Sequence, residues 1–99
     1  MPAKIKYKIG SVTIARKKDV IARIREIFRL AKLGAPLTGF DAELADWLLT
    51  KHPYKDAKLQ GRRIAYYTIG QNNGSTCFIV ELDNGGREHF SYKRALGLK

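Results

Sequence analysis

A hairpin signal between Cys77 and Tyr92 constrains the fold more than any other feature of this sequence. The mainly apolar run CFIVEL comes first, the turn-forming run DNGG follows, and REHFSY ends with Phe90 and Tyr92 on either side of a polar Ser91. Short runs rich in β-branched and aromatic residues on both sides of an Asn-Gly turn are typical of two strands joined as a hairpin. The sequence therefore predicts two adjacent antiparallel strands near the C-terminus.

Two registers fit this hairpin. A two-residue loop at 84–85 would set Glu81 opposite Glu88, and like charges directly opposite each other destabilise a strand pair. A three-residue loop at 83–85, with Gly85 left-handed, sets Glu81 opposite Arg87 and Phe78 opposite Phe90. We predict the second register. Its buried face holds Phe78, Val80, Leu82, Phe90 and Tyr92, and its other face holds Cys77, Ile79, Glu81, Arg87, His89 and Ser91.

Residues 16–32 have the spacing of an amphipathic helix. At about 100° per residue, six apolar side chains fall in one sector: Val20, Ile21, Ile24, Ile27, Phe28 and Ala31. One flank of that sector holds Lys18, Arg25, Arg29 and Lys32, and the other holds Asp19, Arg23 and Glu26. The basic flank fits a row of phosphate contacts. It fits equally well a solvated face whose stems cover the edge of the core.

A second helix is predicted over residues 40–51, with Thr38 as its N-cap. Its predicted buried face comprises Phe40, Leu44, Trp47 and Leu48. Pro53 ends the helix and leaves His52 at its C-terminus, where the helix dipole would favour the charged imidazole.

The remaining strands complete an α+β fold. Alternation predicts strands at 4–9 and 12–14 around a Gly10-Ser11 turn, and at 63–71 and 76–82 around an NNGS turn. Lys4, Lys6 and Lys8 fit a protected sheet edge, and residues 53–63 read as an irregular basic connector. We expect one domain over residues 1–99. Its mainly antiparallel sheet would carry the pair of helices on one face, with a short helix at the C-terminus.

The net charge points to a polyanionic partner. The chain carries 19 Lys and Arg against 9 Asp and Glu, a net charge of +10 in 99 residues, and such a balance attracts nucleic acid. A single cysteine fits a reducing compartment. No apolar run is long enough for a membrane span, and the N-terminus lacks the apolar core of a secretory signal. We therefore expect a cytoplasmic protein without a membrane partner, with a monomer favoured.

A second group of candidate binding residues follows the second helix. Lys58, Arg62 and Arg63 form a basic cluster with Lys55, just before Tyr66 and Tyr67. Adjacent strand residues point to opposite faces, so one of the two tyrosines should be in the core and the other at the surface. An exposed tyrosine beside arginines is a platform on which a base stacks. A cross-strand packing role is the alternative.

Catalysis is not predicted. In the chosen register Cys77, His89 and Ser91 share a face, but His89 and Ser91 stand roughly 6–7 Å apart along one strand. The sequence has no nucleophile elbow, Cys-x-x-Cys or His-x-x-x-His pattern, and its one Cys and two His are too few for a metal site or cofactor ligation. Asp41, Glu43 and Asp46 are the densest carboxylates. Asp41 and Asp46 lie about 140° apart on a helix, which favours a solvated face over metal-dependent RNA cleavage.

Several of these motifs together resemble the DCL domain, named for the plant defective-chloroplasts-and-leaves protein. The resemblance rests on His52-Pro53, on Lys58 and Gly61, on Cys77-Phe78, on the turn at 83–86 and on Phe90-Ser91-Tyr92. The chain departs from the family in its longer DNGG turn and in Ala95, where the family often has Cys. Because the two helices also fit, the resemblance covers nearly the whole chain.

The resemblance implies a role with RNA. In plants the domain is associated with chloroplast ribosomal RNA maturation, and it forms a C-terminal module of the largest subunits of two plant-specific RNA polymerases. The family has no established catalytic residues to carry over. Charge and resemblance together favour a non-catalytic nucleic-acid-binding module, with RNA preferred. The alternative is a protein-interaction module that docks on a ribonucleoprotein or polymerase partner through an edge strand at 4–9.

Overall fold

Four helices and two antiparallel sheets make up the part of the chain described by the computed structural model, which covers residues 7–10, 12–72 and 74–97. The first sheet pairs β1 with β2, and the second has the order β3-β4-β5. The elements are β1 (Tyr7–Ile9), β2 (Val12–Ile14), α1 (Lys17–Leu30), α2 (Gly39–Lys51), α3 (Lys55–Leu59), β3 (Ile64–Asn72), β4 (Ser75–Leu82), β5 (Arg87–Phe90) and α4 (Tyr92–Ala95). The predicted α+β class is confirmed.

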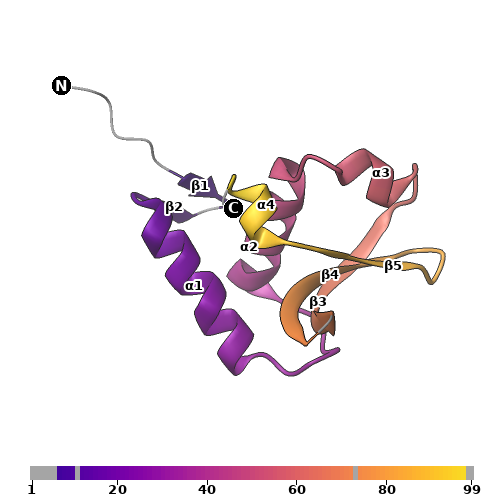
Figure 1. Ribbon diagram of the computed structural model, residues 1–99, viewed down its shortest axis with the longest axis horizontal. Coiled ribbons are helices and arrows are strands. Elements are labelled where there is room, and N and C mark those ends of the chain that lie inside the picture. Colours follow the sequence, from indigo (N-terminus) through magenta and orange to yellow (C-terminus); the bar gives the residue numbers. More distant parts are fainter. Residues whose placement is uncertain (1–6, 11, 73, 98–99) are drawn as a thin grey trace.

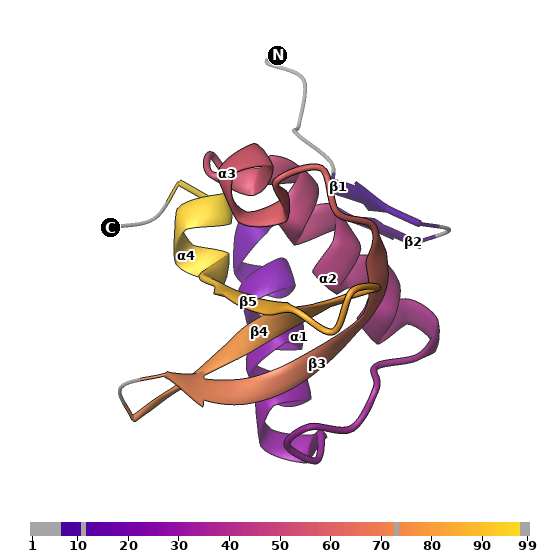
Figure 2. The ribbon, with the colours of Figure 1, turned by 90° about the vertical axis from the view of Figure 1, so that its right-hand side faces the viewer.

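Both long helices cover the same face of the three-stranded sheet. Figure 1 shows α1 and α2 on one side of the molecule and the sheet on the other. In Figure 2 the sheet lies in front of both helices, with α3 and α4 near one end of it. The face of the sheet that points away from α1 and α2 therefore has no helix layer over it.

The hairpin has the predicted register. Phe78 lies opposite Phe90, Ile79 opposite His89 and Glu81 opposite Arg87. Gly85 adopts φ +86°, and the N–H of Leu82 donates to the Gly86 carbonyl at 2.7 Å. The Arg87 guanidinium pairs with the Glu81 carboxylate, which also accepts a hydrogen bond from Thr68. The Arg87 bond comes first among the causes that lower the pKa of Glu81.

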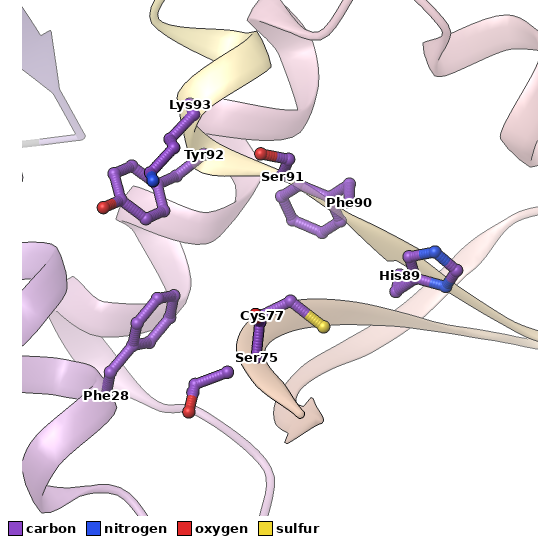
Figure 3. Close-up of a pocket in the computed structure, with 9 residues that line it drawn as sticks. Phe28, Ser75, Cys77, His89, Phe90, Ser91, Tyr92 and Lys93 are labelled. Carbon is purple, nitrogen blue, oxygen red and sulfur yellow. The ribbon is translucent and has the colours of Figure 1, made fainter. Parts of the chain in front are cut away.

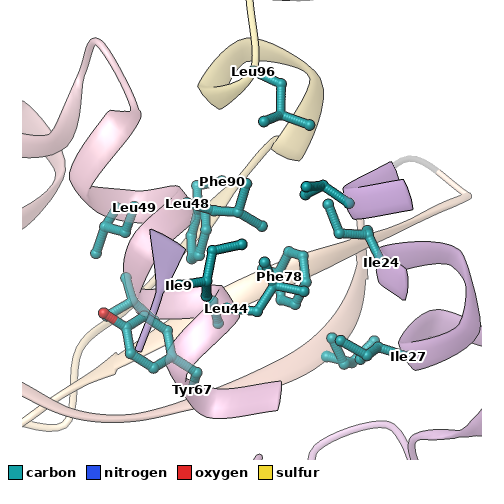
Figure 4. Packing of buried hydrophobic residues seen from close by; sticks show 14 of the residues in the cluster. Ile9, Ile24, Ile27, Leu44, Leu48, Leu49, Tyr67, Phe78, Phe90 and Leu96 are labelled. Atoms are coloured by element: carbon teal, nitrogen blue, oxygen red, sulfur yellow. The ribbon is translucent and has the colours of Figure 1, made fainter. Parts of the chain in front are cut away.

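The core lies between the inner face of this sheet and the two helices (Figure 4). Val20, Ile24 and Ile27 of α1 are buried, with Ile21, Phe28 and Ala31 packed against them as predicted. The rings of Phe78 and Phe90 stack at 5.7 Å. Ile9 from β1 and Leu96 beyond α4 close the core from the other end.

Helix α2 buries a wider face than predicted. Leu44 and Leu48 are buried as expected, but Ala45 and Leu49 are buried too, whereas Phe40 and Trp47 are only half-buried. The reason is that α2 lies between the sheet, β1 and α4, so it has neighbours on more than one side. Thr38 is the N-cap residue, although its side chain makes no capping hydrogen bond.

The predicted irregular connector contains a helix. Residues 55–59 form α3, which ends at Gln60 in the left-handed conformation, φ +50°. Within the described residues, β1 covers the last three positions, 7–9, of the first predicted strand. Lys4, Lys6 and the turn residue Ser11 lie outside the described residues.

The loop between α1 and α2 covers one edge of the sheet. The N–H of Gly34 donates to the Ile69 carbonyl at 2.9 Å, and the N–H of Leu37 donates to the Tyr67 carbonyl at 2.8 Å. These bonds extend the ladder beyond β3 without another strand. No helix in the described ranges is long and apolar enough to cross a membrane.

Candidate nucleic-acid interface

Four predicted phosphate-binding residues lie along one flank of α1. Lys18, Arg25 and Arg29 line a shallow surface hollow of about 490 Å³ together with Ile21 and Ala22. Lys32 follows one turn beyond Arg29, just past the helix end, and all four side chains are exposed. We call these four residues the basic flank.

The charges of the basic flank have no internal counterion. Within residues 7–10, 12–72 and 74–97, the ion pairs formed by acidic side chains involve Arg16, Arg23, Arg62 and Arg87. Glu26 borders the same hollow, but its carboxylate accepts from Arg23 at 3.2 Å. The four cations therefore face solvent, where they can exchange their mobile anions for phosphates.

A larger groove of about 560 Å³ adjoins the basic flank where α1 faces the start of β4 (Figure 3). Phe28 of α1 links the groove to the flank, because Arg25 lies one turn before it on the same helix. The Phe28 ring contacts Phe78 at 5.0 Å and Tyr92 at 5.7 Å between centroids. The groove is lined by Phe28, Ser75, Thr76, Cys77, His89, Phe90, Ser91, Tyr92 and Lys93.

The Cys, His and Ser side chains of the hairpin meet in this groove without forming a proton-transfer chain. In the part of the chain that the structure describes, no hydrogen bond joins His89 to Cys77 or Ser91. Burial raises the pKa of the Cys77 thiol, and the positive charge of Lys58 opposes that shift only in part. The thiol is therefore a weak nucleophile at neutral pH, since the thiolate is the reactive form.

The basic residues after α2 have three different environments. Arg62 folds back on α3, donating to the carbonyls of Lys58 and Leu59 at 2.9 Å each, and lies 3.8 Å from a Glu88 carboxylate oxygen. Arg63 is exposed beside the β4–β5 turn, where its carbonyl accepts the Asp83 N–H. Lys58 lies within electrostatic reach of both Cys77 and His52. The structure thus bonds Arg62 to α3 and leaves the Arg63 side chain exposed.

The two adjacent tyrosines are on opposite faces, as the strand alternation predicts. Tyr67 is in the core, and its hydroxyl donates to Asp46 at 2.6 Å. Burial, followed by this bond and the Asp46 charge, raises its pKa strongly. Tyr67 is therefore unavailable as a stacking platform, which corrects its inclusion among the binding residues. Tyr66 is 45% exposed on the sheet face that has no helix layer.

His52 contradicts the expectation based on the helix dipole. It caps α2 as predicted, but its ring is buried and its Nδ1 accepts the Tyr54 N–H at 3.1 Å. Burial, Lys58 and Arg94 lower the pKa of His52 below its usual range. Desolvation and two neighbouring cations outweigh the dipole here, so the neutral imidazole is the favoured form.

The carboxylates of α2 are used within the fold. Asp41 accepts from Arg23 at 3.0 Å, and Asp46 accepts from Tyr67. Among the described residues, no three His, Cys, Asp or Glu side chains gather in a group that could hold a metal ion.

Sequence reasoning missed the groove and its cation Lys93. The hairpin alternation continues through Tyr92 in the sequence, whereas in the structure β5 ends at Phe90 and α4 begins at Tyr92. The sequence YKRAL predicts a short helix, but the direction in which this helix leaves the sheet depends on tertiary packing. Because α4 turns away from β4 after Phe90, the groove stays open beside the start of β4.

Comparison with known proteins places this geometry in a family. Residues 25–96 match the family described as "Protein of unknown function (DUF3223)". The chain belongs to this family. The matched region includes most of the basic flank and all of the groove, and no curated protein sequence matches the chain.

A solved structure shares the fold. The solution NMR structure of an uncharacterized protein from Rhodospirillum rubrum superposes with a TM-score of 0.77 at 24% sequence identity. The alignment covers 96% of this chain and 91% of that chain. The similarity supports the arrangement of helices and strands along nearly the full length.

Proposed function

We propose that this chain is a small non-catalytic module that binds nucleic acid, with RNA preferred, through the basic flank of α1. The observation that carries the proposal is the alignment of four cations on one helix flank without an internal counterion. Exposed cations that have no ion pair keep their charge available to a ligand. Several of them on one helix flank can contact successive phosphates of one nucleic-acid strand.

Lys58, Arg63 and Tyr66 are proposed contacts apart from the basic flank. Arg63 and Tyr66 lie at the start of β3, where Tyr66 offers an exposed ring for stacking on the sheet face that points away from α1. Arg62 takes part through its effect on α3 and the residues that follow, since its guanidinium is bonded to that helix. Base identity is not read by a recognition helix, so affinity is expected to depend more on salt than on sequence.

The resemblance to the DCL domain supports RNA over DNA and a place in ribosomal RNA processing or ribonucleoprotein association. A cytoplasmic monomer is the form that we propose. The raised pKa of Cys77 supports the non-catalytic assignment, because no activated nucleophile accompanies the basic surface. The alternative, docking on a ribonucleoprotein protein through the edge of β1, predicts association that survives nuclease treatment.

Fluorescence anisotropy tests the proposal directly. The wild-type chain is titrated with single-stranded RNA, duplex RNA and duplex DNA at two salt concentrations. We expect the tightest binding to RNA and a log affinity that falls steeply with log salt. Binding of all three no better than micromolar at low salt would refute the proposed function.

A charge-matched pair of variants locates the interface. The double variant R25Q/R29Q removes two cations of the basic flank, and K8Q/K51Q removes two from the β1–α2 side of the molecule, where both lie beside Trp47. We expect R25Q/R29Q to lower the log–log salt slope on single-stranded RNA by about 1.4, at about 0.7 per lost contact. Equal losses in the two double variants would mean that binding follows net charge and not the basic flank.

A further inference from the structure

The groove beside the basic flank exists because β5 leaves β4 early. The ladder between β4 and β5 runs from the Phe78–Phe90 pair to the Glu81–Arg87 pair. Strand β4 continues to Ser75, paired with β3 only. Three residues of β4, 75–77, therefore have no strand neighbour on the side that faces the groove.

The hydrogen-bond pattern between β4 and β5 determines which backbone N–H and C=O groups point out of this open edge. The N–H of Leu82 points toward the β5 side, where it donates to Gly86. Backbone polar groups alternate sides along a strand, so those of Val80, Phe78 and Thr76 point the same way. The N–H and C=O of Thr76 thus face the groove, and among the described residues neither has a hydrogen-bond partner there.

The walls of the groove suit a flat, polar-edged ring. Phe28, Phe90 and Tyr92 come from the helix side of the sheet, and Cys77 and His89 come from the other face. Figure 3 shows Phe28 and Tyr92 on one side of the opening and His89 on the other, with Ser91 and Ser75 on facing walls. The volume of about 560 Å³ is in the range of about 300–1,000 Å³ that is usual for small-molecule sites.

The charge around the groove selects an anionic ligand. Lys93 lies in its lining and is exposed, and it has no ion pair within the described ranges. Arg25 lies one turn before Phe28 on α1, and Lys32 lies just past the end of that helix. An aromatic slot with a lysine in its lining and further cations on the adjoining helix matches a base joined to its phosphates.

We propose that this groove takes up one unstacked nucleobase of a single-stranded RNA whose phosphates lie on the basic flank. The base stacks against the aromatic wall, and its Watson–Crick edge pairs with the N–H and C=O of Thr76. Each of the four bases presents a neighbouring donor and acceptor on that edge, so the site is tolerant of base identity. This inference rests on the proposed function and gives it a ligand class: single-stranded nucleic acid in place of duplex.

A peptide strand fits the same edge less well. Strand addition needs a run of alternating outward donors and acceptors. Here only Thr76 offers an outward pair, because Cys77 and Ser75 point theirs at β3, and α4 blocks continuation past Phe90. The cationic surroundings also favour a polyanion over a neutral peptide.

A base-dependent binding measurement tests the inference. The wild-type chain is titrated with a uridine octamer and with an octamer of 1-deoxyribose phosphates that has the same charge but no bases. The variant S75L/S91L places aliphatic side chains on the facing walls, and Ser91 makes no capping hydrogen bond that the change would remove. The control T13L/T50L places two leucines in place of hydroxyl side chains at exposed positions of β2 and α2.

We expect wild type and T13L/T50L to bind the uridine octamer at least about fivefold more tightly than the base-free octamer. S75L/S91L should bind the two octamers equally, with its affinity for the base-free octamer unchanged within twofold. Retention of the wild-type preference in S75L/S91L would overturn the groove while leaving the basic flank intact. Failure of wild type to bind either octamer would refute the proposed function itself.

NMR on the wild-type chain gives an answer that does not depend on a variant. Uridine 5′-monophosphate should shift the amide resonances of Thr76, Cys77 and Lys93, whereas ribose 5-phosphate should leave Thr76 and Cys77 unchanged. Shifts confined to residues 18–32 with both compounds would show that phosphate binds the basic flank but that no base enters the groove.

Discussion

The two flanks of α1 carry similar side chains but have different uses in the fold. On one flank, Arg23 donates to Glu26 at 3.2 Å and to Asp41 at 3.0 Å, and its guanidinium lies over the Phe40 ring. On the other, the basic flank is exposed and has no ion pair in the described part of the chain. The comparison teaches that the pairing of a cation, more than its presence, distinguishes a structural arginine from a candidate binding residue.

The largest expected effect is a loss of RNA affinity when the basic flank of α1 is neutralised. Neutralising the whole basic flank in K18Q/R25Q/R29Q/K32Q removes four proposed phosphate contacts at about 0.7 released counterions each. We expect the affinity for single-stranded RNA to fall about 600-fold at 0.1 M salt. Thermal unfolding should be unchanged or shifted upward, because self-repulsion decreases. Anisotropy and a melting curve on the same sample check both parts, and a large drop in stability would make the flank structural.

A substitution on the other flank of α1, at Arg23, should lower stability and leave RNA binding nearly unchanged. Arg23→Ala removes two carboxylate contacts and the contact with the Phe40 ring, so we expect a loss of about 1 kcal/mol in the free energy of unfolding. The affinity of Arg23→Ala for RNA should stay within about threefold of the wild-type value, because the variant loses only one charge, and that charge is not part of the basic flank. Urea denaturation measures the first quantity. Arg25→Ala is the matched control and should change stability by less than about 0.5 kcal/mol.

Tyr66 and Tyr67 repeat the comparison at neighbouring positions. Tyr67→Phe leaves Asp46 without its hydroxyl donor, so we expect about 1 kcal/mol of lost stability and unchanged RNA binding. Tyr66→Ala should leave stability nearly unchanged and weaken single-stranded RNA binding about fivefold, the lower limit for one stacked base. Unchanged RNA binding in Tyr66→Ala would remove this residue from the interface.

The smallest effect concerns pH and the buried His52. Its pKa in the folded chain is lowered below the usual 6.5, so the unfolded chain binds a proton first as the pH falls. The stability contributed by neutral His52 is complete above about pH 6.5 and decreases below it, by at most about 1.4 kcal/mol per pH unit. Unfolding measured from pH 7.5 to 5 should show a weaker pH dependence in His52→Gln than in wild type. The exposed His89→Gln serves as control, and identical profiles in the two variants would contradict the assignment.

Local patterns determined most of the secondary structure. The turn residues at 83–85 and the penalty for opposing Glu81 and Glu88 were enough to predict the hairpin register, because both depend only on the turn and on directly opposite residues. Helical spacing placed the basic flank next to Phe28, since the angle between two helical residues depends only on their separation. The family resemblance and the net charge predicted nucleic acid as the class of partner, but neither predicted where on the molecule it would bind.

Tertiary structure decided which residues have partners. Arg62 and Arg63 are adjacent and chemically identical, yet only Arg62 finds the carbonyls of α3, because the chain turns back at Gln60. Neither the burial of His52 nor the choice between Tyr66 and Tyr67 could be read from local spacing, since each depends on elements distant in sequence. The groove likewise exists only because β5 ends at Phe90 and α4 packs toward α2, leaving Thr76 at an open edge. The sequence alone specified the elements and their faces; long-range packing determined which polar groups remain without partners and so available to a ligand.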